Sequence, residues 1–291
     1  MTMPLFHKLI AEYAEVGGGD LNLTPTVGEP LADRYLIERI KFARANPAIK
    51  NIGMYSNLIS LQRFGAEELV HSGLASLTVS TSGFDEDMYK RVYRSTEYKR
   101  MYKNVMAFAR ANLDAGSPVF LFVDMRADRP AKEVFSYPDY KSLANLIGEK
   151  RIGLKFRYDN WAGRITQNQL LGNMKLRSHI NLLRPRISPC SELYNGPMVY
   201  WDGRVGACGC RDVDARDLII GDANTEHIAD IWMGHKLKTL REEFLTSKIK
   251  DICKTCTHYN PIAVVMRHDH IKYLQNIHPI TRPETISRIQ D

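Results

Sequence analysis

The sequence predicts an α/β protein in which a parallel sheet, open or curled into a barrel, precedes a small cysteine-rich module. Through residue 160, helical patterns alternate with single short apolar strands, which is typical of βα units on a parallel sheet. All five cysteines lie after residue 189, which sets the last third of the chain apart. The 291 residues suit one large domain, or a domain of about 200 residues with a smaller one attached.

The first elements are predicted from helical periodicity. A helix is expected over residues 5–16, because apolar side chains recur on one face and the glycines at 17–19 end the pattern. A short strand follows over 20–24. Residues 31–46 predict an amphipathic helix whose inner face is Leu36, Ile37, Ile40 and Ala43 and whose outer face is Arg34, Glu38, Arg39 and Lys41.

The remaining elements continue the alternation. Strands are expected over 51–55, 74–80, 119–124 and 152–158, with helices over 66–72 and 97–113. Ligands of such sheets bind at the carboxyl ends of the strands. The segments that matter most are therefore 24–30, 55–57, 80–83, 124–126 and 158–163.

The first of these segments leaves its strand through Pro25, turns at Gly28 and places Glu29 at the strand top. A carboxylate beside exposed backbone is suited to hold the ammonium group of a ligand. The alternative is a turn in which Glu29 begins the next helix, where the helix dipole favours negative charge.

A basic segment joins the two parts of the chain. It carries Arg164, Lys175, Arg177, Arg184 and Arg186, and no Asp or Glu occurs from 161 through 191. Such a segment would bind a phosphate or another anion of a substrate; the alternative is a solvated connector with surplus charge. The net charge of +7 leaves nucleic acid open as a partner, but no nucleic-acid motif accompanies it and that role ranks last.

Composition and the N-terminal sequence indicate where in the cell the protein is expected. Apolar residues make up 44% and charged residues 25% of the chain, which is ordinary for a globular protein with a core. No apolar run approaches the roughly 18 residues of a membrane span, and the N-terminus lacks the features of a signal peptide. We therefore expect a cytoplasmic protein with no membrane partner and no disulfide framework.

The last third predicts a metal site built on thiols. Residues 198–201 and 204–207 flank Asp202–Gly203, a strong hairpin signal. Cysteines lie before the hairpin, at its exit and beyond a helix predicted over 228–244: Cys190, Cys208, Cys210, Cys253 and Cys256. Four thiolates would surround a zinc ion or a cubane iron–sulfur cluster, and spacing does not choose between them. The alternative is a set of unliganded thiols.

These motifs resemble those of a known family. The pattern Cys190-x12-Gly203-x4-Cys208, the turn at 221–224, Ile231–Trp232 and Cys253-x2-Cys256 resemble the auxiliary-cluster domain (SPASM or twitch) of radical S-adenosylmethionine (SAM) enzymes. Upstream, 27–30 (VGEP) is similar to the family's GGE motif, 79–94 to its fourth-strand segment and 158–163 to its sixth-strand ending. The resemblance covers about residues 5 to 260.

The resemblance implies cofactors and site residues. Gly28 and Glu29 would bind the methionyl amino group of SAM, and Ser80 and Arg94 would contact SAM. The cysteines would hold one [4Fe–4S] cluster, with the fourth ligand left open between Cys208 and Cys210. No catalytic side chain is assigned. The implied partners are a peptide or anionic small-molecule substrate and a reductant such as flavodoxin or ferredoxin.

The resemblance also implies a fold and its boundaries. We expect a partial (β/α)6 radical-SAM-type barrel missing its first strand, plus a small C-terminal α+β cysteine-rich module. The expected boundaries are 1–163 for the barrel, 164–189 for the basic connector, 190–260 for the iron–sulfur domain and 261–291 for a tail.

One departure from the family decides the expected activity. Radical SAM enzymes hold their catalytic cluster with C-x3-C-x2-C after the first strand, whereas no cysteine precedes Cys190 here. The helix over 5–16 would correspond to the family's first helix, so the first strand and cluster loop would lie upstream of Met1. We expect a fragment of an enzyme that forms a 5′-deoxyadenosyl radical, itself inactive in SAM cleavage. The alternatives are a relative acting as an electron-transfer or binding module, or a zinc-stapled structural protein.

Overall fold

A computed structural model of the chain describes residues 1–177, 186, 188–209, 211–246 and 248–262. Arg184, Cys210 and nearly all of the expected tail over 261–291 lie outside the described residues. The described chain divides into two compact units. We call residues 18–157 and 170–175 the sheet unit, and residues 1–17, 158–169 and 176–262 the cysteine unit. The predicted boundaries at 163 and 189 do not coincide with this division and stay a prediction.

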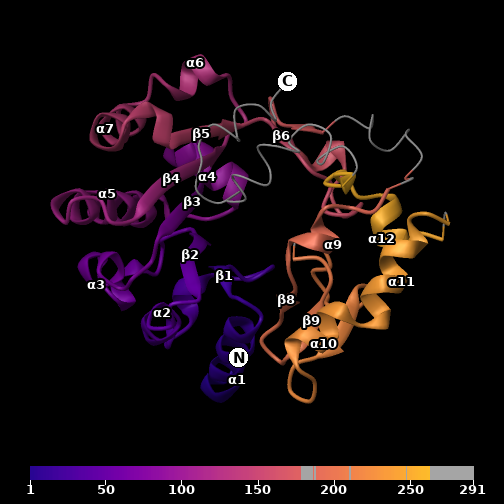
Figure 1. Ribbon diagram of the computed structural model, residues 1–291. Helices are drawn as coiled ribbons and strands as arrows, with labels where there is room; N and C mark the ends of the chain where they lie inside the picture. The colour runs from indigo at the N-terminus through magenta and orange to yellow at the C-terminus, as the bar shows by residue number, and fades with distance from the viewer. Residues whose placement is uncertain (178–185, 187, 210, 247, 263–291) are drawn as a thin grey trace. The chain divides into compact units, whose positions relative to one another are not determined.

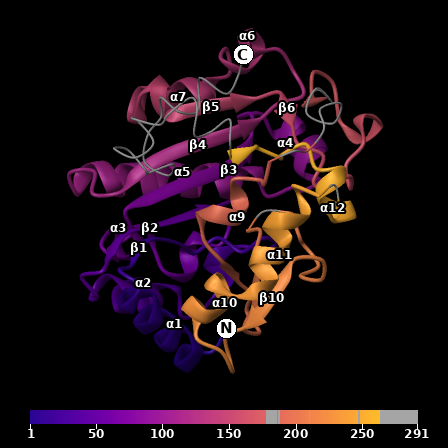
Figure 2. The same cartoon turned by 45° about the vertical axis from the view of Figure 1, so that its right-hand side comes forward.

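The sheet unit is built on five parallel strands that follow one another in chain order (Figure 2). These strands are β1 (Gly19–Asn22), β2 (Ile49–Ser56), β3 (Ser76–Ser82), β4 (Phe120–Arg126) and β5 (Ile152–Lys155). The predicted α/β fold with a parallel sheet is thereby confirmed. The strand predicted over 152–158 is interrupted at Phe156, and its end forms a separate strand, β6 (Arg157–Tyr158), that pairs with β7 (Lys175–Leu176).

Helices α2 (Leu36–Arg44), α3 (Ala66–Val70), α5 (Tyr98–Asp114) and α7 (Pro138–Ile147) lie along one face of this sheet (Figure 1). Side chains alternate across a strand, so Leu121, Val123 and Met125 of β4 share one face, and all three are buried. This apolar face is the one that the helices cover. Asp124 and Arg126 therefore belong to the opposite face. The strand register places Ser80 beside Asp124 and Lys155 beside Arg126 on that face.

Local capping corrects several helix predictions. The helix expected over 31–46 is split into a short 3-10 turn, Pro30–Ala32, and α2, because Asp33 accepts a hydrogen bond from the Tyr35 N–H (3.0 Å) between them. Two short helices, α4 (Glu86–Tyr93) and α6 (Ala131–Val134), were not expected, and neither was α7. α4 begins because the Asp85 side chain accepts from the Met88 N–H at 2.8 Å.

The cysteine unit has its own core. Its antiparallel sheet has the strand order β10-β9-β8, formed by β8 (Met198–Val199), β9 (Arg204–Gly206) and β10 (Ile219–Asp222), so the predicted hairpin is present. The helix predicted over 228–244 is instead α10 (Ile228–Met233) and α11 (His235–Glu243), separated by the extended Gly234. Short helices α9 (Glu192–Asn195) and α12 (Asp251–Lys254) complete it.

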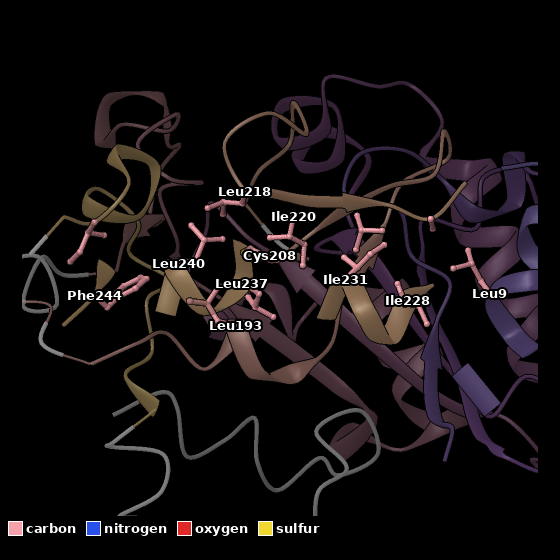
Figure 3. Close-up of a cluster of buried hydrophobic side chains, with 14 of the residues drawn as sticks. Leu9, Leu193, Cys208, Leu218, Ile220, Ile228, Ile231, Leu237, Leu240 and Phe244 are labelled. Atoms are coloured by element: carbon pink, nitrogen blue, oxygen red, sulfur yellow. The ribbon is translucent and has the colours of Figure 1, made fainter. Parts of the chain in front are cut away.

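The first helix, α1 (Met3–Glu15), belongs to the cysteine unit. Leu5 and Leu9 share a buried cluster with residues of α10 and α11, and Figure 3 shows Leu9 and Ile228 among its members. Glu12 accepts a hydrogen bond from the Ile228 N–H at 3.0 Å and so caps α10. The amphipathic pattern predicted the helix but not the unit against which it packs.

Candidate metal centre and the polar face of the sheet

Within its described residues, the cysteine unit contains four cysteines from three separate stretches of sequence. Cys190 precedes α9, Cys208 follows β9, Cys253 lies in α12 and Cys256 follows it. Cys190 forms an antiparallel bridge with Pro261, and the flanking Ser191 N–H donates to the Asn260 carbonyl at 2.8 Å. The bridge holds the first cysteine against the chain that leaves the C-x2-C turn.

These four cysteines are free thiols that influence one another. Burial and, after it, the negative charges of Cys208, Cys256 and Cys190 together raise the pKa of Cys253 to about 12, whereas Arg186 opposes them. Burial likewise raises the pKa of Cys190 and of Cys256. Cys208 belongs to a buried hydrophobic cluster against which Cys190 and Cys253 pack, and Cys256 lies three residues after Cys253. The four cysteines therefore lie in one region of the unit.

The donor set fits an iron–sulfur cluster by its chemistry, since thiolates are the protein ligands of such clusters. Because a bound metal replaces the thiol protons, the raised thiol pKa values make binding at this site dependent on pH. Within the described ranges no three His, Cys, Asp or Glu side chains are arranged to hold a single metal ion. Cys210, the fifth predicted ligand, lies outside those ranges.

Arg186 contacts the C-x2-C turn directly. Its Nη2 donates to the carbonyl oxygens of Lys254 (3.1 Å) and Cys256 (2.8 Å). Its guanidinium carbon lies 4.3 Å from the centre of the Tyr259 ring. Burial lowers the pKa of Arg186, and the negative charges of Cys256, Tyr259, Cys253 and Cys190 oppose that effect. A cation is therefore held beside the thiol group.

The segment after β6 contacts the same turn from another direction. Asn160 donates through Nδ2 to the Thr255 carbonyl at 2.6 Å and, through its backbone N–H, to the Thr257 hydroxyl at 2.8 Å. Its Oδ1 accepts from the Thr257 N–H at 3.0 Å. The Thr255 hydroxyl in turn donates to the Ala162 carbonyl at 3.0 Å. The 158–163 segment, expected to be a ligand-binding strand end, is here a support for the cysteine turn.

A second cation near Cys256 is paired. Arg211 forms an ion pair with Asp159, with 2.7 Å between Nε and Oδ1, and its guanidinium carbon lies 4.8 Å from the Trp161 ring centre. Arg211 lowers and Asp159 raises the pKa of Cys256. The two charges therefore offset each other at this thiol.

On the sheet unit, Glu29 is engaged by its own chain. Its Oε1 accepts from the Ser56 hydroxyl (2.6 Å) and the Leu31 N–H (3.2 Å), and its Oε2 accepts from the Asn57 N–H (2.8 Å). Glu29 caps the 3-10 turn Pro30–Ala32, so it stands at the start of a short helical turn, near where the alternative interpretation placed it. Gly28 precedes it with φ +132°, a conformation that favours glycine.

The cation that hydrogen-bonds Ser80 in the described structure is Arg126. Its Nη1 donates to the Ser80 hydroxyl at 2.7 Å and to the Tyr93 hydroxyl at 2.5 Å. Arg94, the predicted SAM contact, is an exposed residue with φ 52° at the C-terminal end of α4. Arg126 was not predicted as a site residue, although its strand end, 124–126, was marked as important.

An ion pair between the half-buried Lys155 and the buried Asp124 lies on the same face. Lys155 Nζ is 2.6 Å from Asp124 Oδ2, and the Asp124 side chain is only 5% exposed. Asp124 Oδ1 is buried without a hydrogen-bond partner among the described residues. The polar face of the sheet, which we define as Ser80, Asp124, Arg126 and Lys155, is therefore lined by charged groups rather than by the apolar residues of the helical face.

Comparison with known proteins agrees with the two-part architecture. Residues 190–257 match the SPASM family, described as an iron–sulfur cluster-binding domain. The chain is 24% identical over 216 residues to a GTP 3′,8-cyclase of Alkaliphilus metalliredigens, and 28% identical over 112 residues to one of Petrotoga mobilis. These matches cover 71% and 38% of this chain, and 62% and 34% of the respective relatives. The chain thus spans less than two thirds of the length of these relatives.

Solved structures share the fold at low sequence identity. Streptococcus suis SuiB bound to S-adenosylmethionine aligns over 90% of this chain and 66% of its own, with a TM-score of 0.54 and 13% identity. BtrN in complex with AdoMet and 2-DOIA aligns over 88% of this chain and 80% of its own, with a TM-score of 0.52 and 15% identity. An anSMEcpe structure with AdoMet and a peptide aligns over 88% and 78%, with a TM-score of 0.53 and 12% identity.

The C-terminal module is thus an iron–sulfur cluster-binding domain of the SPASM class. Together with the relatives and the shared fold, it supports a protein of the radical SAM/SPASM family, as the motifs predicted. No helix within the described residues combines the length and the apolar character needed to cross a membrane.

Proposed function

We propose that the chain is an iron–sulfur protein of the radical SAM/SPASM family in which Cys190, Cys208, Cys253 and Cys256 bind one [4Fe–4S] cluster. The observation that carries this proposal is that Cys190 and Cys253 pack against the buried cluster containing Cys208, within the segment that matches an iron–sulfur cluster-binding domain. Cys210 is either a substitute ligand or a neighbouring thiol. When bound, the cluster supplies one-electron transfer.

The chain's own residues hold the site in shape. Arg186 and Asn160 fix the carbonyl oxygens of the C-x2-C turn, and the Pro261 bridge fixes Cys190. Cys208 is buried and the other three cysteines are half-buried, which limits the access of water to the site. A reductant such as flavodoxin or ferredoxin is the proposed electron donor, in the cytoplasm, where thiols stay reduced.

The carboxyl ends of the sheet are the proposed binding site for SAM. Gly28 and Glu29 would take the methionyl amino group, and Ser80 and Arg94 would contact the remainder, as the resemblance implies. The structure adds Arg126, whose guanidinium is held by Ser80 and Tyr93 and is suited to a carboxylate. We propose that binding is weak, because no thiolate of the sheet unit anchors an iron atom there.

We propose that residues 1–291 alone do not cleave SAM reductively. Reductive cleavage requires a cubane with one iron free of cysteine, and the sequence carries no cysteine before Cys190. The cysteines after residue 189 belong to the auxiliary site, which has at least four thiolates for its four irons. A peptide or an anionic small molecule is the proposed substrate of the parent activity; a peptide is favoured by the fold shared with SuiB bound to its precursor peptide.

Anaerobic reconstitution with iron and sulfide tests the cluster. The full chain should bind about four irons, as a cubane contains, and absorb broadly in the visible range. The double variant Cys253→Ser/Cys256→Ser should bind none while remaining folded by circular dichroism. Stoichiometric zinc with no iron in the reconstituted wild-type chain would assign the same thiols to a structural zinc site instead.

A further inference from the structure

We propose that Arg186, which precedes the matched domain, sets the reduction potential of the cluster by its charge, and that Asn160 holds the cluster turn by position alone. This inference rests on the proposed cluster. It assigns roles to two residues outside 190–257, the segment that matches the SPASM family.

Arg186 is a buried charge without a carboxylate partner among the described residues. Arg186 is only 8% exposed. One of its terminal nitrogens, Nη1, is buried with no hydrogen-bond partner among the described residues. The other donates only to backbone carbonyls, and within the described structure no carboxylate pairs with the guanidinium. Burying a charge without a counter-charge is costly, so the neighbouring group that supplies negative charge matters.

The neighbouring group with negative charge is the proposed cluster with its cysteine ligands. Arg186 donates to the Cys256 carbonyl at 2.8 Å and so lies beside the turn that carries Cys253 and Cys256. Burial lowers the pKa of Arg186, and the negative charges of Cys256, Tyr259, Cys253 and Cys190 oppose this effect. A cluster with its four thiolates is anionic, and reduction adds one further negative charge. A fixed cation in a medium of low polarity stabilises the more negative state. Arg186 therefore favours the reduced cluster and raises its potential.

Arg211 is the other guanidinium near Cys256. Arg211 is paired with Asp159, so its net effect on the thiol is small. Arg186 has no such partner within the described residues. The structure therefore singles out Arg186 as the uncompensated charge.

Asn160 provides the contrasting role. It is a neutral residue, 6% exposed, that holds the Thr255 carbonyl and both polar groups of Thr257. With Arg186 on the carbonyls of Lys254 and Cys256, three successive carbonyl oxygens of the turn are fixed from outside the domain. Asn160 contributes geometry without charge, which makes it the matched control.

The experiment uses the full reconstituted chain and two readouts: the midpoint potential of the cluster, by anaerobic titration, and the rate of iron loss to a chelator. Arg186→Gln should shift the potential to more negative values, whereas Arg186→Lys, which keeps the charge, should stay near wild type. Asn160→Ala should lose iron about tenfold faster, as outer partners of metal sites do, at an unchanged potential. Arg164→Gln, at an exposed ion pair with Asp214, should change neither.

Each outcome decides the inference. An iron-loaded Arg186→Gln variant with the wild-type potential overturns the role of the charge. If Arg186→Gln takes up no iron while Arg186→Lys and Asn160→Ala do, the charge is required for the cluster to form, and the role assigned to it in setting the potential is overturned. If neither Arg186 variant takes up iron but Asn160→Ala does, Arg186 acts by geometry and the inference is wrong. A wild-type chain that binds no iron would instead refute the proposed cluster itself.

Discussion

Asn160 and Thr257, 97 residues apart in the chain, are joined by three hydrogen bonds of 2.8 to 3.1 Å. Each residue both donates to and accepts from the other, and both are buried. Because buried polar groups are costly when unpaired, this reciprocal contact is a strong constraint on the segment after β6. It ties that segment to the C-x2-C turn within the cysteine unit.

The fourth ligand can be separated from its neighbour by serine substitution. Cys208→Ser should abolish the cluster and Cys210→Ser should leave it largely intact, because the charge of the buried Cys208 acts directly on Cys253. Iron content and visible absorption after reconstitution measure both variants. Retention of the cluster in Cys208→Ser with loss in Cys210→Ser would reverse the assignment.

Weak SAM binding should depend on Arg126. Replacing Arg126 with Gln removes the cation held by Ser80 and Tyr93, and a lost charged hydrogen bond corresponds to about a tenfold rise in the dissociation constant. Arg94→Gln should cost less, because Arg94 is exposed. Equilibrium dialysis with labelled SAM measures both. Equal or larger loss in Arg94→Gln would return the role to the residue that the resemblance implies.

The 291-residue chain should not cleave SAM. After reconstitution and reduction with dithionite, 5′-deoxyadenosine should not exceed the level found with Cys253→Ser/Cys256→Ser. The reason is that every cysteine lies after residue 189 and none is available to the sheet unit. Turnover above the control would mean that the C-terminal cluster is itself catalytic.

α1 should stabilise the cysteine unit. Leu9→Ala removes a buried side chain from the cluster that it shares with α10 and α11, and such a change costs about 2–5 kcal/mol. The matched control is Val16→Ala at the end of the same helix, where the side chain is 55% exposed and the cost should be below about 0.5 kcal/mol. Urea unfolding measures both free energies. Similar values for the two variants would refute the packing of α1 on this unit.

The sequence predicted local features better than their tertiary partners. The strands of the sheet followed from apolar runs between turn signals, and Asp202–Gly203 located the hairpin. The periodicity of residues 5–16 could not say that Leu9 packs with Ile228, because an amphipathic face does not specify its partner. The helical pattern resumes after Gly234, so the sequence predicts one continuous helix where the structure has two.

The site was predictable to a similar degree. Cysteine spacing and the hairpin indicate a metal centre, which stays a prediction; in the described structure Cys190 and Cys253 pack against the buried cluster that contains Cys208. From the sequence alone, Arg186 is one charge of a basic connector, and Asn160 is one residue of the 158–163 segment that resembles a sixth-strand ending. Their roles depend on hydrogen bonds to residues 68 to 97 positions later in the chain, which no local pattern encodes.

The turn at residues 161–163 also bears on the order of folding. Trp161, Ala162 and Gly163 have φ values of +47°, +55° and +90°, and a non-glycine residue in this region costs on the order of 1–3 kcal/mol. The contact that holds the turn, from Thr255 to the Ala162 carbonyl, comes from a residue 93 positions later. Within the turn the Asn160 carbonyl accepts from the Gly163 N–H at 3.0 Å. The hydrogen bond from Thr255 is added only once the C-x2-C segment has been translated, so the full set of contacts of this turn forms late in synthesis.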